Sequence, residues 1–196
     1  MWRTLLYRKG PPLPKHIIVI NPSVSWKGFN LAVTADYRGG HQVYHGIGSD
    51  MDFTGSSARS GANGRQRFIV PNSVYFDGTK FVENTTVLTA NGGYGFYEAT
   101  ANNRGINSNY LTSAAAWKIR EIVISYRFSD NVLRKLKVVK NASIALTARN
   151  MFTFLPQSNE WTETEFANTT GNFVGVNNTS QLPPNRFYGL NVVLGF

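Results

Sequence analysis

The sequence predicts an all-β protein made of antiparallel strands, and two observations lead to this prediction. Several segments alternate between apolar and polar residues, whereas no segment of comparable length shows the helical period of about 3.6 residues. The connections between these segments also alternate, between short turns and very long loops. Since successive side chains of a strand point to opposite sides, the alternation predicts strands with one apolar and one polar face.

The predicted strands are residues 16–26, 28–38, 115–128, 141–154 and 185–196. The second is the clearest, because one of its faces is wholly apolar and consists of Phe29, Leu31, Val33, Ala35 and Tyr37. In the third strand, Trp117 and Ile119 are out of phase with the apolar residues that follow. This predicts a bulge, or an emergence from the apolar layer, near Arg120. Asn150 is the one misfit on the apolar face of the fourth strand.

The connections indicate how the strands are arranged. Lys27 and Gly28 predict a tight turn between the first two strands, with a glycine available for positive φ. Residues 39–114 and 155–184 are long loops, which a compact soluble domain rarely tolerates. Short turns on one side, long loops on the other and aromatic strand ends are typical of a β-barrel in a bacterial outer membrane. A soluble β-sandwich also alternates, but it explains neither the aromatic ends nor the unequal loops.

The predicted strands are too few to close a barrel, because the smallest closed barrels have about eight. We therefore expect residues 14–196 to be the last part of a larger barrel, and residues 1–13 to be an atypical segment left by truncation or a misread frame. The first residues lack the apolar run of a secretory signal. No stretch of about 18 apolar residues predicts a transmembrane helix.

Charge and cysteine content narrow the function classes. The chain has 20 Lys and Arg residues against 11 Asp and Glu residues, and it has no cysteine. Disulfides, thiolate metal sites and cysteine nucleophiles are therefore excluded. Only part of the positive charge is clustered, at residues 3–15 and 134–140, so nucleic-acid binding is not expected.

Four segments carry a resemblance to a known family. They are WKGFNLAVTADYRGG (residues 26–40), AAAWKIREIVISYRF (114–128), ASIALTARNMFTF (142–154) and PPNRFYGLNVVLGF (183–196). In this order, and with these loop lengths, they resemble the C-terminal barrel of SusC/RagA-type TonB-linked outer-membrane transporters of Bacteroidota. Met151 stands where the family has leucine.

The resemblance implies the last five strands of a barrel of about 22 strands, with long extracellular loops. It implies import of glycans or peptides with energy from TonB, which this chain alone would not perform. The implied partners are the outer membrane, the rest of the barrel with its plug, a SusD-like lipoprotein lid and the barrel-assembly machinery. TonB would be contacted only through the missing N-terminal part. The resemblance also makes Phe196 an expected assembly signal, the alternative being an interfacial aromatic only.

The sequence predicts no catalytic, cofactor or metal site, and we do not expect an enzyme. His41 and His45 lie in a glycine-rich loop with no partner cysteine. Asp50 and Asp52 lack the remaining ligands of a calcium loop, so we expect solvated acids there.

The remaining candidate residues follow from the barrel interpretation. Residues 72–84 predict a hairpin around Asp77 and Gly78. Loop aromatics that would contact substrate or lid, or pack within the loop itself, are Tyr75, Phe76, Tyr94, Phe96 and Tyr97. Charged residues expected to face the lumen or plug are Asp36, Arg127 and Arg149. Aromatics expected at the lipid interface are Trp26, Phe29, Tyr37, Tyr126, Phe128, Phe152 and Tyr188.

These observations favour a barrel segment of a nutrient importer in the outer membrane. Two alternatives remain at this point. One is a truncated remnant without function, and the other is a soluble β-protein that binds acidic polymers through its basic clusters.

Overall fold

The computed structural model describes residues 10–99, 103–136, 138–167 and 171–196, which belong to two compact units. Among the described residues, those within 1–43, 113–175 and 181–196 form unit 1, and those within 44–112 and 176–180 form unit 2. Most of the regular structure is antiparallel strand, so the predicted all-β class is confirmed. Most of the predicted atypical segment, residues 1–13, lies outside the described residues. No helix in the described part of the chain is both long and apolar enough to cross a membrane.

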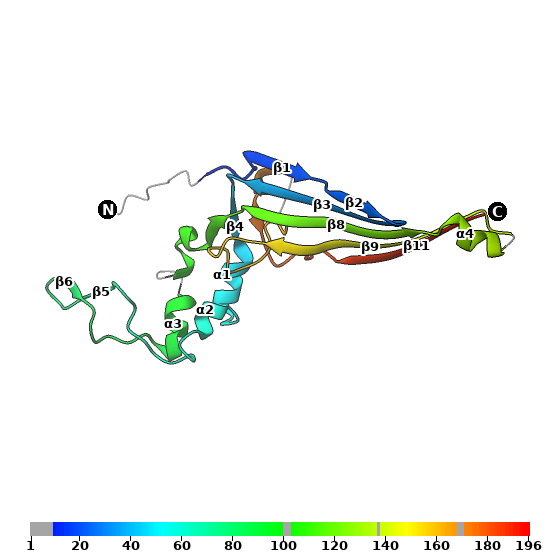
Figure 1. Cartoon of the computed structure of the whole chain (residues 1–196). Coiled ribbons are helices and arrows are strands. Elements are labelled where there is room, and N and C mark those ends of the chain that lie inside the picture. The colour runs from blue at the N-terminus through cyan, green and yellow to red at the C-terminus, as the bar shows by residue number, and fades with distance from the viewer. Residues whose placement is uncertain (1–9, 100–102, 137, 168–170) are drawn as a thin grey trace. The chain divides into compact units, whose positions relative to one another are not determined.

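Unit 1 is built on a six-stranded antiparallel sheet (Figure 1). Its strands are β1 (His16–Ile20), β2 (Ser23–Trp26), β3 (Phe29–Gly39), β8 (Ala116–Arg127), β9 (Asn141–Phe154) and β11 (Phe187–Gly195). Their order is β1-β3-β8-β9-β11, and β2 also pairs with β3. The described strands therefore form an open sheet with β1 and β2 along one edge and β11 along the other.

One predicted strand is interrupted in the structure. Residues 16–26 form β1 and β2, which both pair with β3 and flank Asn21 and Pro22. Proline has no N–H group to donate to a ladder, which breaks the regular pairing there. The Pro22 carbonyl still accepts a hydrogen bond of 3.0 Å from the Val33 N–H group of β3. The two short strands therefore lie one after the other along the same edge of β3.

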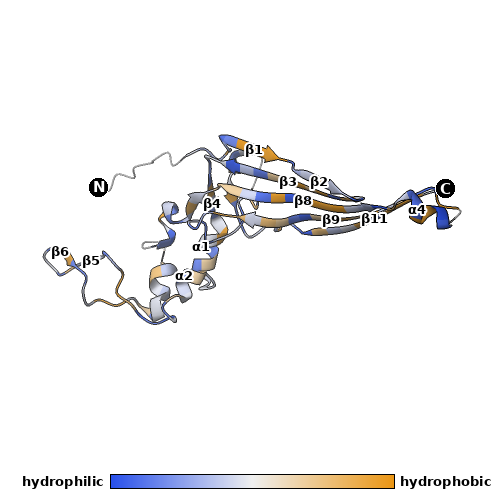
Figure 2. Ribbon diagram, in the orientation of Figure 1, coloured by the Kyte–Doolittle hydropathy of each residue, from blue (hydrophilic) through white to orange (hydrophobic). Residues whose placement is uncertain are grey.

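The strand register places the apolar residues of neighbouring strands on one face of the sheet. Leu31 lies opposite Ile124, which lies opposite Leu146, which in turn lies opposite Leu190. Figure 2 shows hydrophobic and hydrophilic residues alternating along β8 and β9. These side chains are exposed, with 56% of Leu146 and 64% of Leu190 accessible to solvent. The sheet therefore presents a continuous apolar face that no described part of the chain covers.

The predicted irregularity near Arg120 is a β-bulge. In β8, Glu121 pairs with Thr34 and Ile119 pairs with Ala35, so Arg120 is an extra residue against β3. The inserted residue restores the phase, and it brings Ile119 onto the same face as the later apolar residues. A second shift lies between β8 and β9, at Asn150, whose φ of 56° removes it from the alternation. This geometry explains the misfit of Asn150, whose amide donates to the Asn185 carbonyl at 3.1 Å.

Short connections gather at one end of this sheet. Lys27 and Gly28 have φ values of 47° and 88°, which confirms the predicted tight turn between β2 and β3. Between β8 and β9, the chain forms α4 (Asp130–Leu133) and the 3-10 turn η4 (Arg134–Leu136). The Arg127 N–H group donates to the Gly28 carbonyl at 2.9 Å, so both connections lie at the same end.

Unit 2 contains most of the predicted loop 39–114, which is more regular than expected. Its elements, some of which begin or end in unit 1, are β4 (Gln42–His45), α1 (Gly46–Phe53), α2 (Ala58–Gly61), β5 (Val74–Phe76), β6 (Phe81–Glu83), η1 (Asn91–Gly93), α3 (Tyr94–Tyr97), η3 (Asn107–Tyr110), β7 (Leu111–Ser113) and β10 (Val176–Asn177). β5 and β6 form the predicted hairpin, in which the Asp77 carboxylate accepts hydrogen bonds from the N–H groups of Thr79 and Lys80. The second predicted loop, residues 155–184, supplies β10, which pairs in parallel with β4. In unit 1 this loop also contains the 3-10 turn η5 (Gly171–Phe173).

Candidate functional site

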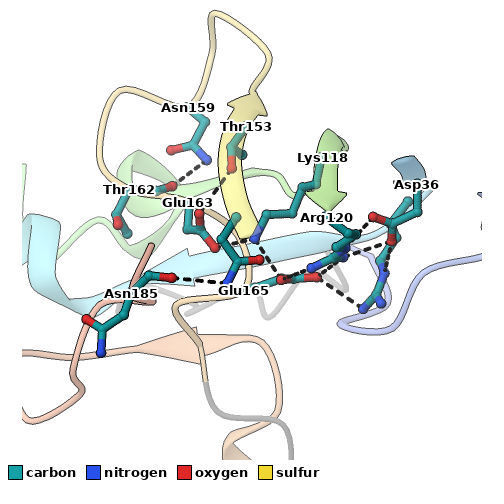
Figure 3. Close-up of polar contacts among 11 residues, drawn as sticks. Asp36, Lys118, Arg120, Thr153, Asn159, Thr162, Glu163, Glu165 and Asn185 are labelled. Atoms are coloured by element: carbon teal, nitrogen blue, oxygen red, sulfur yellow. Dashed lines mark hydrogen bonds and ion pairs between the residues drawn. The ribbon is translucent and has the colours of Figure 1, made fainter. Parts of the chain in front are cut away.

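A network of ion pairs occupies the polar face of the unit 1 sheet (Figure 3). Asp36 on β3 lies opposite Lys118 on β8, and the bulge residue Arg120 reaches the same carboxylate. Glu163 and Glu165, which follow β9 in the chain, complete the network. Three segments that are distant in the sequence therefore meet at this site.

The contacts of this network are short and numerous. Lys118 Nζ lies 2.5 Å from Glu163 Oε1 and 2.7 Å from Glu165 Oε2. Arg120 donates to Asp36 Oδ2 at 2.8 Å and to Glu165 Oε2 at 2.6 Å. Arg38 adds contacts of 3.0 Å to Asp36 and 3.3 Å to Glu165. Because each carboxylate contacts at least one cation, the network holds the segment that carries both glutamates on the sheet.

The network is balanced in charge, and its Asp36 and Lys118 side chains are shielded from water. It contains three cations and three carboxylates, and only 4% of the Lys118 side chain is exposed. Buried charges are tolerated only when they are paired, which this arrangement achieves. Burial alone would raise the pKa of Glu165, but the hydrogen bonds and charges of Arg120 and Lys118 lower it to about 2. Glu165 is therefore a fixed anion rather than a proton donor at neutral pH.

A cavity of about 460 Å³ borders this network within unit 1. Arg38, His41 and Glu165 contribute polar groups to its lining, and Val43 and Val174 contribute apolar ones. Burial, followed by the charge of Arg38, lowers the pKa of His41. The imidazole is therefore expected to be neutral, which leaves the guanidinium groups as the cations of the cavity.

Unit 2 has a buried polar cluster around Asp52, and the prediction of a solvated acid at Asp52 is wrong. The Asp52 carboxylate is fully buried and is paired with Arg59. It also accepts hydrogen bonds from Asn103 Nδ2 at 2.7 Å and from the Tyr110 hydroxyl at 2.8 Å. Burial alone would raise the pKa of Asp52, but hydrogen bonds from Arg59, Ser57 and Tyr110, together with the charge of Arg59, lower it below its ordinary value. Asp50, which lies on the same helix, is exposed as predicted.

His45, the last residue of β4, is also fully buried in unit 2. Its Nδ1 atom lies 2.8 Å from Asn177 Nδ2, and its Nε2 atom lies 2.9 Å from Thr112 Oγ1. Burial lowers the pKa of His45 to about 4, so the ring is neutral at pH 7. These contacts tie both β10 and β7 to β4. In the described ranges, no group of three or more His, Asp or Glu side chains is arranged to hold a metal ion.

The predicted loop aromatics fall into two groups. Phe96 and Tyr97 pack against Phe68 inside unit 2, each with a ring-centroid distance of 6.1 Å. By contrast, Tyr75, Phe76 and Tyr94 keep 36%, 57% and 41% of their surface exposed. The exposed group is therefore better placed to contact another molecule.

The predicted charged residues share the polar face of the sheet but do not pair with one another. Asp36 binds Arg38 and Arg120, as described above. Arg149 Nε lies 2.7 Å from Glu121 Oε1. Arg127 is exposed and forms no ion pair with any residue that the structure describes.

The predicted interfacial aromatics lie toward the two ends of the apolar face. At the turn end, Trp26 lies opposite Phe29. The ring centre of Tyr126 lies 4.5 Å from that of Phe29 and 5.0 Å from that of Phe128. The opposite end holds Tyr37, Phe152 and Tyr188, together with Trp117 and Phe154, which the sequence-based prediction missed. Trp117 was missed because its assignment to this face depends on the bulge. Phe196 follows β11 and is exposed.

The sequence-predicted residues do not include most of the ion-pair network. Arg38, Lys118, Glu163 and Glu165 were not singled out, and no local pattern marks them. The phase change at Arg120 was the only signal available, because it predicted an irregularity in the strand but not its partners.

Comparison with known proteins supports the fold. No family model and no curated protein matches the chain. A chain of the RagAB peptide importer in the 'closed-closed' state matches with a TM-score of 0.61 at 15% identity, over 96% of this chain and 18% of that one. A RagAB peptide transporter structure gives a TM-score of 0.55 at 14% identity, over 91% and 17% of the two chains. The 'open-open' state gives 0.53 at 18% identity, with the same coverage. The chain thus spans less than a fifth of the length of these solved chains.

Proposed function

We propose that this chain supplies barrel strands to an outer-membrane nutrient importer of the SusC/RagA type. The exposed apolar face of the sheet, bordered by aromatic residues at both ends, carries the proposal. Such a face suits contact with lipid, because lipid requires apolar side chains outside and a fully paired backbone. The likeness to RagAB importer chains, which extends over nearly the whole of this chain, supports the same assignment.

The length of the apolar face fits a membrane. Phe29 and Tyr37 mark its two ends on β3. Eight steps of about 3.3 Å separate them by about 26 Å along the strand. A tilt of about 40° reduces this to about 20 Å, close to the apolar band of about 25 Å in known barrels. A soluble protein rarely exposes a continuous apolar surface of this extent.

The polar face would then line the lumen. Asp36, Arg127 and Arg149 lie on that face, and the ion-pair network would hold residues 163–165 against the inner wall. The open edges at β1 with β2 and at β11 would pair with the remaining strands of the barrel. In this proposal, the plug and the TonB contact belong to those other parts, and this chain does not transport alone.

The substrates we propose are peptides or glycans, and the matched structures of a peptide importer favour peptides. Unit 2 would lie on the extracellular side, with Tyr75, Phe76 and Tyr94 available to substrate or to a SusD-like lipoprotein lid. In the complete importer, replacing these three residues by alanine is expected to weaken uptake or lid binding. Unchanged uptake at normal surface levels would contradict this role.

The orientation of the sheet can be tested with single cysteines, because the chain has none of its own. We would label Ile124→Cys and Leu146→Cys on the apolar face, and Ser125→Cys and Ala145→Cys as matched controls on the polar face. In the complete importer reconstituted in phospholipid vesicles, a quencher attached to the lipid chains is expected to quench the first pair strongly and the second pair weakly. Equal quenching of both pairs would refute the proposed membrane orientation.

A further inference from the structure

The short-turn end of the sheet carries a group of exposed cations that the barrel assignment does not use. Lys27 occupies the turn between β2 and β3, and Arg134, Lys135 and Lys140 belong to the connection between β8 and β9. We call these four residues the basic turn patch. Within residues 129–136 and 138–140, Asp130 is the only acid, and none of the four cations forms an ion pair with a described residue.

Backbone hydrogen bonds place this patch next to the aromatic residues at the turn end. The Phe128 N–H group donates to the Ala142 carbonyl at 3.0 Å, and the Lys140 N–H group donates to the Gly195 carbonyl at 2.7 Å. The Lys27 ammonium group lies 4.9 Å from the ring centre of Trp26. The cations therefore lie just beyond the aromatic end of the apolar face. Figure 2 shows hydrophilic and hydrophobic residues together in the region around α4.

The connection between β8 and β9 also has features of a membrane-interface segment. An open hollow of about 480 Å³ is lined by Arg134 and Lys140, by Asp130, and by the apolar Leu133 and Val139. Val132 and Val138 are exposed, at 46% and 63%. Cations beside exposed aliphatic side chains suit the boundary where phosphate groups meet acyl chains.

We propose that the basic turn patch binds the phosphate groups of anionic phospholipids in the leaflet that faces the short turns. The inference rests on the proposed function, because the apolar face must first place the turn end at a membrane surface. The aromatic residues would lie at the level of the headgroups, and the four cations would contact the phosphates just outside them. Each cation near an anionic surface strengthens binding about fivefold at low salt.

The test compares binding of the full chain to neutral phosphatidylcholine vesicles and to vesicles with about 30% phosphatidylglycerol. The patch variant is K27Q/R134Q/K135Q/K140Q. The matched control, K15Q/R65Q/K80Q/R186Q, removes the same charge from four exposed cations elsewhere. We expect the wild type and the control to bind the anionic vesicles at least about tenfold more tightly than the neutral ones, and the patch variant to lose this difference. The preference should also disappear when salt is raised from about 0.02 M to about 0.5 M.

Three results would overturn the proposal. They are an unchanged preference in the patch variant, an equal loss in both variants, and no preference in the wild type. Binding to neutral vesicles separates this inference from the proposed function. If the apolar-face cysteines are quenched but the anionic preference is absent, the barrel orientation stands and the basic turn patch has no lipid role.

Discussion

Replacing Asp52 by Asn is expected to destabilise unit 2 selectively. The substitution keeps the shape of the side chain but removes the charge that the Arg59 guanidinium contacts. It also places an amide group where the Asn103 amide and the Tyr110 hydroxyl now donate. Removing one partner of a buried ion pair typically costs about 3 to 5 kcal/mol. We expect the lower value, about 3 kcal/mol, because Arg59 keeps 21% of its side chain exposed.

Native-state hydrogen exchange of the full chain measures this effect. A loss of about 3 kcal/mol corresponds to exchange about 150-fold faster at amides that open together with α1. The Thr54 and Ser56 N–H groups, which donate to Asp50 and Met51 carbonyls at 3.0 Å and 2.8 Å, are suitable reporters. Amides of β3, β8 and β9 should keep their rates, because they belong to unit 1.

Asp50→Asn is the matched control, since it makes the same chemical change at an exposed acid on the same helix. Tyr110→Phe should have a smaller effect than Asp52→Asn, about 1 to 3 kcal/mol, because it removes one hydroxyl and leaves the ion pair. If Asp52→Asn and Asp50→Asn change exchange equally, the buried cluster does not stabilise unit 2 and the reasoning fails.

Three further predictions follow from single contacts. Gly28→Ala should lower the stability of the folded chain in detergent micelles by about 2 kcal/mol or more, because φ is 88° and an added Cβ would lie 2.7 Å from the Arg127 carbonyl oxygen. The folded pKa of His45 is about 4, against about 6.5 when unfolded. The neutral ring therefore contributes its full stabilisation above pH 6.5, and the free energy of unfolding falls by about 3 kcal/mol as the pH is lowered to 4. An NMR titration of the ring should have its midpoint near pH 4. Arg120→Met should release the segment around Glu165 and speed proteolysis within residues 155–167, since two carboxylates lose a cation.

Each of these predictions has a control or a contrary outcome. Gly189→Ala is the control for the turn variant, because the nearest atom to its added Cβ is 3.8 Å away. An NMR midpoint for His45 above pH 6 would show that the ring is not buried as described. For the network, Arg127→Met removes an exposed cation from the same strand. Equal proteolysis of the two arginine variants would argue against an anchoring role for Arg120.

The candidate site was only partly predictable from the sequence. The turn at Lys27 and Gly28, the irregularity at Arg120 and the hairpin at Asp77 each depend on neighbouring residues, and the structure confirms all three. The partners of Arg120 lie 84 and 45 residues away in the chain, so no local pattern could identify them. Asp52 was predicted to be a solvated acid for the same reason, because its partner Tyr110 lies 58 residues further along the chain.

The sequence by itself determined where the strands run and which face of each is apolar. This was possible because the alternation of side chains is a local property, with a period set by backbone geometry. Only the tertiary structure decided the burial of Asp52 and His45 and the charge network on the polar face. Those features arise when distant segments meet, and burial then makes pairing a condition of stability for charges that water would otherwise solvate.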